Sequence, residues 1–194
     1  MRIGVYLFDG AEELDWAGPW EVLAAWAQLW PDDEVDVFTL AREAGTITCA
    51  KGLRVLPDRT WGDAGRLDVV VVPGGSGTQR ERGDETVLEW LRTLHRGGTL
   101  TTSVCTGSTV LAAAGLLAGK PATTWWGALD RLADSDGSIE VRPDDRFVDA
   151  GEVVTAAGVS AGIDMALHLV ARLHSVDRAR EVKRYIQYDP APPV

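Results

Sequence analysis

The sequence contains few of the residues that build disulfide frameworks and metal centres. Its 194 residues include two cysteines and three histidines. Two cysteines can form at most one bridge, and a chain of this length with 45% apolar residues can bury a core without one. His95, His168 and His174 lie in predicted helices and lack the spacing of a metal site. We expect one domain over residues 1–194, with free thiols and no metal or organic cofactor.

Long apolar runs and basic clusters are also missing. The apolar stretch at residues 3–8 turns at Asp9-Gly10, so it is too short for a secretory signal or a membrane span. The formal net charge of -10 would repel phosphate backbones, and no basic cluster reverses it locally. These features predict a cytoplasmic protein that binds neither nucleic acid nor membranes.

Short apolar strands alternate with helical patterns along the chain. Strands are expected at residues 2–8, 34–40, 69–72, 99–104, 139–141, 147–150 and 153–156. Helices are expected at residues 21–29, 86–95, 108–114, 126–132 and 161–174, where apolar residues recur on one face. The alternation predicts an α/β fold with a mostly parallel sheet covered by helices on both faces.

Cys105 stands where a β-rich run ends and small residues open a helix. This pattern is typical of a strand-to-helix elbow, which lifts a nucleophile out of the sheet near the positive end of the next helix. We therefore expect the Cys105 thiol to have a pKa well below about 8.5. Cys49, in a predicted strand or hairpin away from the site, is not expected to share this property. The alternative is that Cys105 is a buried cysteine that serves as a small apolar residue.

A second strand, residues 69–72, ends in the glycine-rich loop Pro73-Gly74-Gly75. The unhindered amides of Gly74 and Gly75 could form an oxyanion hole, although the same residues also form ordinary turns. Loops at the carboxyl ends of neighbouring parallel strands converge on one crevice. We therefore expect this loop to lie beside Cys105.

The loop after the first strand carries several acids. Asp15 or Glu13 could face the cysteine and transfer protons, with the neighbouring sulfur raising the carboxyl pKa. Alternatively, these acids only favour the start of a helix near Pro19.

Four tryptophans flank these segments, and they could line an apolar pocket or simply pack in the core. They are Trp16, Trp20, Trp125 and Trp126.

Seven motifs together make the chain resemble the ThiJ/PfpI superfamily and, within it, the isonitrile hydratases. They are VYLFDG (5–10), LDWAGP (14–19), VPGG (72–75), SVCTGS (103–108), AAAGLL (112–117), ATTW (122–125) and GVSAGID (158–164). The ending at residues 186–193 also resembles the tail of the hydratases. The resemblance implies a flavodoxin-like three-layer sandwich, a class I glutamine amidotransferase-like domain, and a homodimer.

The resemblance also implies roles for individual residues. Cys105 would be the nucleophile, Asp15 its acidic partner, and Thr106 the residue that positions substrate or water. Gly74 and Gly75 would fall in the backbone-amide loop of the family. Trp16 and Trp125 would contribute to a pocket for a small uncharged organic substrate.

Trp125 marks a departure from the family, because many relatives carry histidine at this position. This weakens protease, deglycase and glyoxalase interpretations, which need an imidazole near the thiol.

The activity implied is that of a lyase: hydration of an isonitrile to an N-substituted formamide through a covalent thioimidate. Two alternatives are a redox or stress-response protein in which Cys105 is oxidised, and a ligand-sensing domain like those of AraC-type regulators. No helix-turn-helix module follows Pro193, so we expect the regulator alternative to be the weaker of the two, and turnover separates catalysis from the redox role.

Overall fold

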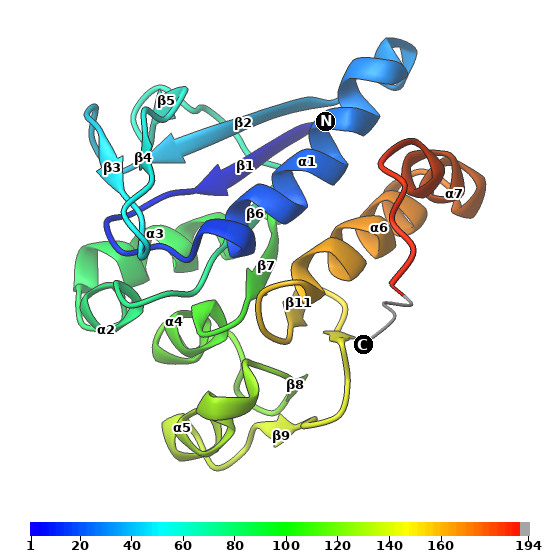
Figure 1. Ribbon diagram of the computed structural model, residues 1–194. Helices are drawn as coiled ribbons and strands as arrows, with labels where there is room; N and C mark the ends of the chain where they lie inside the picture. Colours follow the sequence, from blue (N-terminus) through cyan, green and yellow to red (C-terminus); the bar gives the residue numbers. More distant parts are fainter. Residues whose placement is uncertain (191–194) are drawn as a thin grey trace.

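The computed structural model describes residues 1–190 and contains a central seven-stranded sheet (Figure 1). The strand order is β10-β11-β7-β6-β1-β2-β5. The strands are β1 (Arg2–Tyr6), β2 (Asp36–Ala41), β5 (Arg59–Thr60), β6 (Val69–Val72), β7 (Leu100–Val104), β10 (Phe147–Asp149) and β11 (Val153–Ala156). Every pair is parallel except β10 with β11. The predicted mostly parallel sheet is therefore confirmed.

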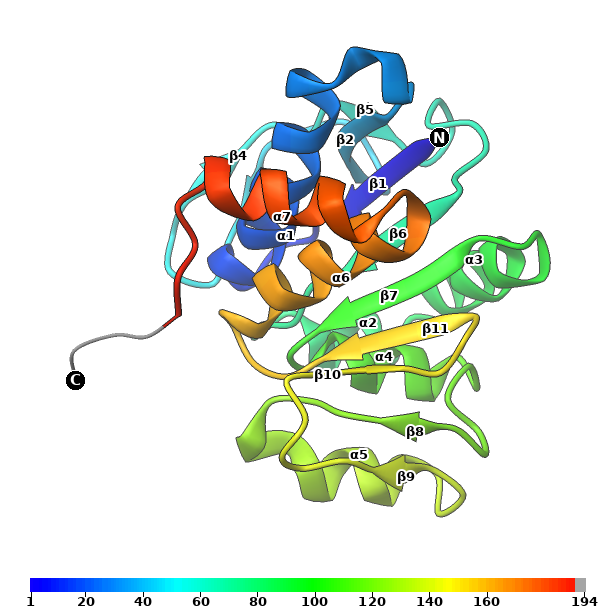
Figure 2. The ribbon, with the colours of Figure 1, turned by 90° about the vertical axis from the view of Figure 1, so that its right-hand side faces the viewer.

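Helices cover both faces of this sheet, which gives the predicted flavodoxin-like three-layer arrangement (Figure 2). One face carries α1 (Glu13–Leu29), α6 (Ala161–Leu173) and α7 (Val176–Tyr185), which pack against one another. The other carries α2 (Thr78–Glu81), α3 (Glu85–Arg96) and α4 (Gly107–Ala113). The remaining elements are η1 (Pro31–Asp33), η2 (Trp126–Ala128), α5 (Leu129–Ser135), the hairpin β3 (Ile47–Thr48) with β4 (Arg54–Val55), and the parallel pair β8 (Pro121–Ala122) with β9 (Glu140–Val141).

The central strands are buried on both faces, as is usual for parallel sheets. All four valines of β6 are buried, and so is every residue of β7 although three of its five residues carry hydroxyl groups. Two of these hydroxyls donate to backbone: Thr102 to Val70 at 3.0 Å and Thr101 to Thr99 at 3.3 Å. Hydroxyls that bond to backbone let a polar strand run through the core to Cys105.

Helix α1 differs from its prediction, because it begins at Glu13 rather than Glu21. Pro19 lies inside the helix, where it lacks the amide that would donate to the carbonyl of Asp15. A proline normally marks a helix boundary in sequence analysis, which is why the first two turns were not predicted. The earlier start places Asp15 in the first turn of a helix rather than in a loop.

Three further segments differ from the predictions or are only partly described. The predicted helix at residues 126–132 is split into η2 and α5, and α7 was not predicted. Of the tail at residues 186–193, residues 191–193 lie outside the described part of the chain. Across residues 1–190, every helix is too short or too polar to cross a bilayer.

Candidate functional site

Cys105 lies in the turn between β7 and α4, as predicted, and its φ of +56° is unusual for a residue with a side chain. Such a conformation costs on the order of 1–2 kcal/mol. Hydrogen bonds to its backbone amide and carbonyl hold this conformation. The Cys105 amide donates to the carbonyls of Ala156 and Ala157 at 3.1 and 3.0 Å, and its carbonyl accepts from the hydroxyls of Thr124 and Ser108 at 2.9 and 3.1 Å.

Asp15 faces the thiol of Cys105 from the first turn of α1 and is completely buried. Its Oδ2 accepts the amide of Gly74 at 2.8 Å, whereas Oδ1 is buried without a hydrogen bond of standard geometry within residues 1–190. Burial raises the pKa of Asp15 from 3.8 to about 7, while the amide of Gly74 opposes this rise. A carboxyl group with this pKa can both accept and release a proton near neutral pH.

The expectation of a low thiol pKa at Cys105 is wrong for this structure. Burial raises the pKa of the Cys105 thiol above its ordinary value, and the negative charge of Asp15 raises it further. The amide and hydroxyl of Thr106 stabilise the thiolate but do not outweigh these effects. The sequence indicated the helix terminus but not the depth of burial. Near neutral pH the Cys105 thiol therefore keeps its proton, and Asp15 is the group of the pair that gains and loses one.

Gly74 and Gly75 lie beside Cys105 as expected, but their amides do not point into an open oxyanion hole. The Gly74 amide donates to Asp15, and the Gly75 amide donates to Thr106 Oγ1 at 3.0 Å. The Thr106 hydroxyl, which accepts from Gly75, faces the sulfur of Cys105. The loop thus orients the acid and the hydroxyl, and the amide of Thr106 is the donor that faces the sulfur.

A cavity of about 410 Å³ opens above Cys105, within the usual size range of small-molecule sites. It is lined by Glu12, Lys51, Gly75, Ser76, Thr78, Gln79, Cys105, Thr106, Trp125, Arg131 and Val159. Trp125 lines this cavity, as predicted. Trp16 is buried in the core and does not line it, and Trp126 is 76% exposed.

Four lining residues were not found from the sequence: Lys51, Gln79, Arg131 and Val159. Lys51 comes from the β3–β4 hairpin, which was expected to lie away from the site. The hairpin is tied to the loop after β1, because the Gly10 amide donates to the Thr48 carbonyl at 2.8 Å. Cys49 itself is buried there and does not line the cavity.

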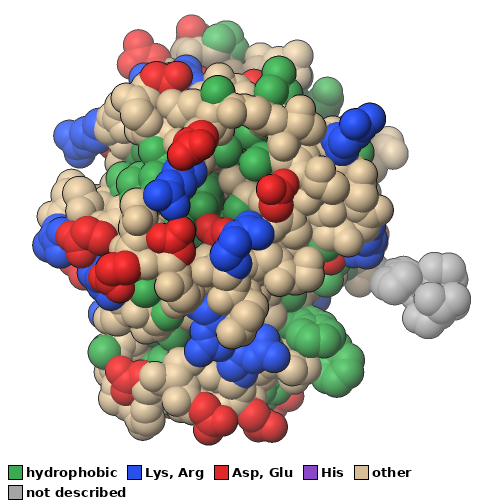
Figure 3. Space-filling model, turned by 90° about the vertical axis from the view of Figure 1, so that its left-hand side faces the viewer, with side chains coloured by type: hydrophobic (Ala, Val, Ile, Leu, Met, Phe, Trp, Pro, Cys, Tyr) green, Lys and Arg blue, Asp and Glu red, His purple; other side chains and the backbone are tan. Residues whose placement is uncertain are grey.

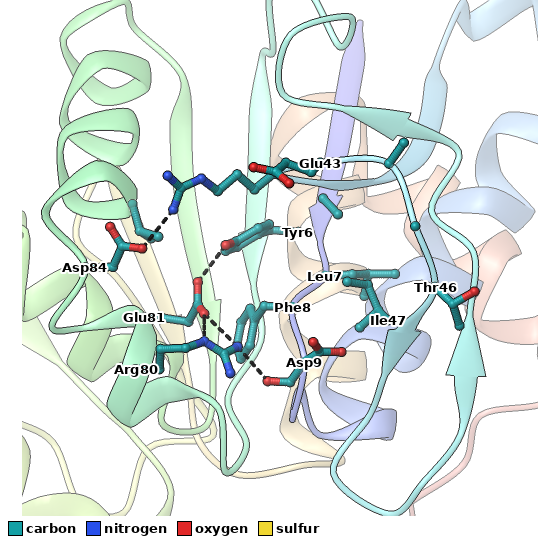
Figure 4. Close-up of a pocket in the computed structure, with 15 residues that line it drawn as sticks. Tyr6, Leu7, Phe8, Asp9, Glu43, Thr46, Ile47, Arg80, Glu81 and Asp84 are labelled. Carbon is teal, nitrogen blue, oxygen red and sulfur yellow. Dashed lines mark hydrogen bonds and ion pairs between the residues drawn. The ribbon is translucent and has the colours of Figure 1, made fainter.

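A second cavity of about 510 Å³ lies between the ends of β1 and β2 and the helices α2 and α3 (Figure 4). At its floor the hydroxyl of Tyr6 donates to the buried Glu81 at 2.6 Å. Arg80 pairs with Glu81 at 3.0 Å, and Arg42 pairs with Asp84 at 2.8 Å. The basic residues are already paired, and no lining residue is a cysteine or histidine. The candidate site is therefore the cavity at Cys105.

Metal ligands do not gather at either cavity. Within residues 1–190, no three His, Cys, Asp or Glu side chains meet in an arrangement that could hold a metal ion.

The fold and this geometry define a class of flavodoxin-like proteins with an acid-paired cysteine at a strand-to-helix elbow. The chain belongs to the DJ-1/PfpI family, which it matches over residues 1–172.

Individual relatives have different functions. An isonitrile hydratase from Pseudomonas putida is 42% identical over 100% of this chain and 81% of its own length. The transcriptional regulator CdhR from Pseudomonas aeruginosa is 33% identical over 74% of this chain and 42% of its own length. The crystal structure of a ThiJ/PfpI family protein from Pseudomonas syringae has a TM-score of 0.88 and 31% identity, covering 100% of this chain and 77% of that one.

Proposed function

We propose that this protein hydrates isonitriles to N-substituted formamides, with Cys105 as nucleophile and Asp15 as acid and base. The observation that carries the proposal is the buried pair itself: a cysteine at a strained elbow beside a carboxyl group whose pKa is raised to about 7. The hydratase of Pseudomonas putida, 42% identical over the whole chain, supports the same chemistry. We also expect a homodimer, which the family resemblance implies, and a location in the cytoplasm.

The first half of the reaction forms a covalent adduct. Asp15 accepts the thiol proton of Cys105, and the resulting thiolate attacks the terminal carbon of the isonitrile. Asp15 then returns the proton to that carbon, which gives a thioimidate, R–N=CH–S–Cys105. The transient thiolate faces the amide and hydroxyl of Thr106. Because Asp15 takes the thiol proton during the reaction, Cys105 does not have to be ionised before the substrate binds.

The second half adds water to the thioimidate. Asp15 accepts a proton from the water, whose oxygen attacks the thioimidate carbon, and passes that proton to the nitrogen. Collapse of the tetrahedral adduct breaks the carbon–sulfur bond and releases R–NH–CHO. The hydroxyl proton of the adduct passes through Asp15 to the sulfur, which restores the starting pair.

Turnover of a simple aryl isonitrile, followed by mass spectrometry of the formamide, tests the proposal. We expect Cys105→Ser to be inactive and Asp15→Asn to lose about a hundredfold or more in rate. The thiol pKa of Asp15→Asn should fall because a negative charge is removed, so this variant should be alkylated faster near neutral pH while failing to turn over. If Asp15→Asn works at the wild-type rate, Asp15 has no such role, and Glu12 or Glu13 becomes the next candidate.

The CdhR relative favours a second candidate, a ligand-sensing domain that binds without reaction. A redox sensor is a further alternative, but a thiol whose pKa is raised is oxidised slowly. Stoichiometric ligand binding to wild-type protein without formamide release would favour sensing over catalysis.

A further inference from the structure

The cavity above Cys105 contains one basic side chain whose charge is not compensated. Arg131, near the start of α5, lines the cavity and makes no side-chain hydrogen bond or ion pair within residues 1–190. The other charged lining residues, Lys51 and Glu12, form an ion pair with each other. The Cys105 thiol, with its raised pKa, is neutral. The charge that the lining residues present to a ligand is therefore that of Arg131.

Basic side chains are the minority among the charged residues of the chain. The chain carries a formal charge of -10, and acidic side chains lie among the basic ones on the side where the β3–β4 hairpin and α5 are found in Figure 1 (Figure 3). Arg131 is exposed, so its guanidinium is accessible to an anion that enters the cavity from solvent. An arginine also presents a planar fork that matches a carboxylate.

Uncharged polar side chains also line the cavity. Ser76 and Gln79 line it from the glycine loop and the adjoining α2, and both are exposed. Trp125 provides an apolar surface in the same cavity. One apolar surface with a few polar groups is the usual composition of a small-molecule site.

We propose that the substrate is a small isonitrile that carries a carboxylate, which binds Arg131 while the isonitrile carbon reaches Cys105. The inference rests on the proposed function and makes Arg131 a specificity-determining residue. It changes the sequence-based expectation of an uncharged substrate: the reacting group is uncharged, but the rest of the molecule is an anion. The volume of about 410 Å³ can hold an aryl ring with both groups.

Matched substrates test the inference through turnover. We would compare 4-isocyanobenzoate with its uncharged methyl ester in the wild type, Arg131→Gln and Arg180→Gln. Arg180 lies on α7, is 74% exposed, and changes the net charge equally without lining this cavity. The wild type should favour the carboxylate by tenfold or more in kcat/KM, chiefly through KM. Arg131→Gln should reduce that ratio to about one, whereas Arg180→Gln should preserve it.

Binding to Cys105→Ser protein provides a test that does not depend on turnover. Calorimetry with 4-formamidobenzoate and its methyl ester should show tighter binding of the anion, and this preference should disappear when Arg131→Gln is added. Equal binding of the two compounds, absence of binding, or a preference unchanged by Arg131→Gln would overturn the inference. If the anion binds through Arg131 but neither isonitrile is hydrated, the proposed function fails and the specificity of the cavity stands.

Discussion

Asp15 is a carboxyl group that the fold holds out of water beside a thiol. Its ionised form is less stable in the folded protein than in the unfolded chain, as the rise of its pKa from 3.8 to about 7 expresses. The site thereby holds a group that can exchange protons near neutral pH, and stability at that pH is reduced in consequence.

This cost predicts a pH-dependent difference between the wild type and Asp15→Asn. The unfolded chain releases the Asp15 proton at a lower pH than the folded protein does, so the wild type loses stability as pH rises from about 4 to 7. Relative to Asp15→Asn, its free energy of unfolding should fall by about 4 kcal/mol over that range. Urea denaturation at several pH values measures the difference. Glu21→Gln, an exposed acid on α1, is the control, and parallel curves for Asp15→Asn and the wild type would contradict the prediction.

Residues next to one another in the chain were the ones that sequence analysis could identify. Cys105 and Thr106 share one motif, and the order of parallel strands was enough to bring the glycine loop and the acidic loop after the first strand to them. The choice of Asp15 over Glu13 came from the family resemblance. Arg131 and Lys51 reach the same cavity through connections whose course no local pattern specifies. The thiol pKa was mispredicted for the same reason, because burial depends on contacts that are distant in sequence.

At the scale of elements, the loop between β6 and α2 must pass unusually close to its neighbours. A Cβ added at Gly74 would lie 2.6 Å from the nitrogen of Thr106 and 2.8 Å from Asp15 Oδ2. At Gly75 the φ is +121° and an added Cβ would lie 2.2 Å from the carbonyl oxygen of Gly10. The backbone approach that aligns Asp15 and Thr106 is possible only without side chains here.

Gly74→Ala should therefore damage the site as well as the fold. We expect a loss of about 1–3 kcal/mol in stability, typical of overpacking. The rate of formamide production should fall by tenfold or more, because Asp15 and Thr106 must move apart to admit the methyl group. Gly137→Ala is the matched control, since nothing lies within 4 Å of its added Cβ. Equal effects of the two substitutions in thermal melts and assays would argue against this account.

The elements missed from the sequence have weak local signals. Helix α7 has a short apolar face, on which Val182 is fully buried and Ala179 is partly buried. Ser175 caps the helix by accepting the Arg178 amide at 3.1 Å. The core strands β6 and β11 were predicted at their observed bounds because they are short apolar runs. Helix α7 was not predicted because most of its residues are charged and its apolar face is short.

At the scale of the whole molecule, one acid joins segments that are 145 positions apart in sequence. Asp33, in η1, accepts from Arg178 of α7 at 2.7 and 3.1 Å and from the indole of Trp26 at 2.6 Å. The Arg178 guanidinium also lies 4.3 Å from the ring centre of Trp30. This cluster connects the end of α1 to the last helix.

Removing the charge of Asp33 should loosen this connection. The side-chain hydrogen bond from Arg178 holds the pKa of Asp33 below its ordinary value, so the interaction stabilises the fold above about pH 4 and is lost as pH falls through the folded pKa. Asp33→Asn should lower the free energy of unfolding by about 1–3 kcal/mol at neutral pH and by less in acid. Asp32→Asn, at the exposed neighbouring position, is the control in denaturant titrations. An equal loss in both variants would rule out the cluster as the cause.

The backbone groups of the glycine loop and its neighbours hold the reactive pair independently of the residues that would contact a ligand. The groups that fix Cys105 and Asp15 are mostly backbone amides and carbonyls, which exist whatever the side chains are. Gln79 and Arg131 are exposed, line the cavity, and take no part in that scaffold. Mutation at these two positions can therefore explore new ligands while the reactive centre stays in place. Members of one family that share a cysteine motif therefore need not share a ligand. Libraries randomised at these two positions are a direct way to change the ligand preference of this protein.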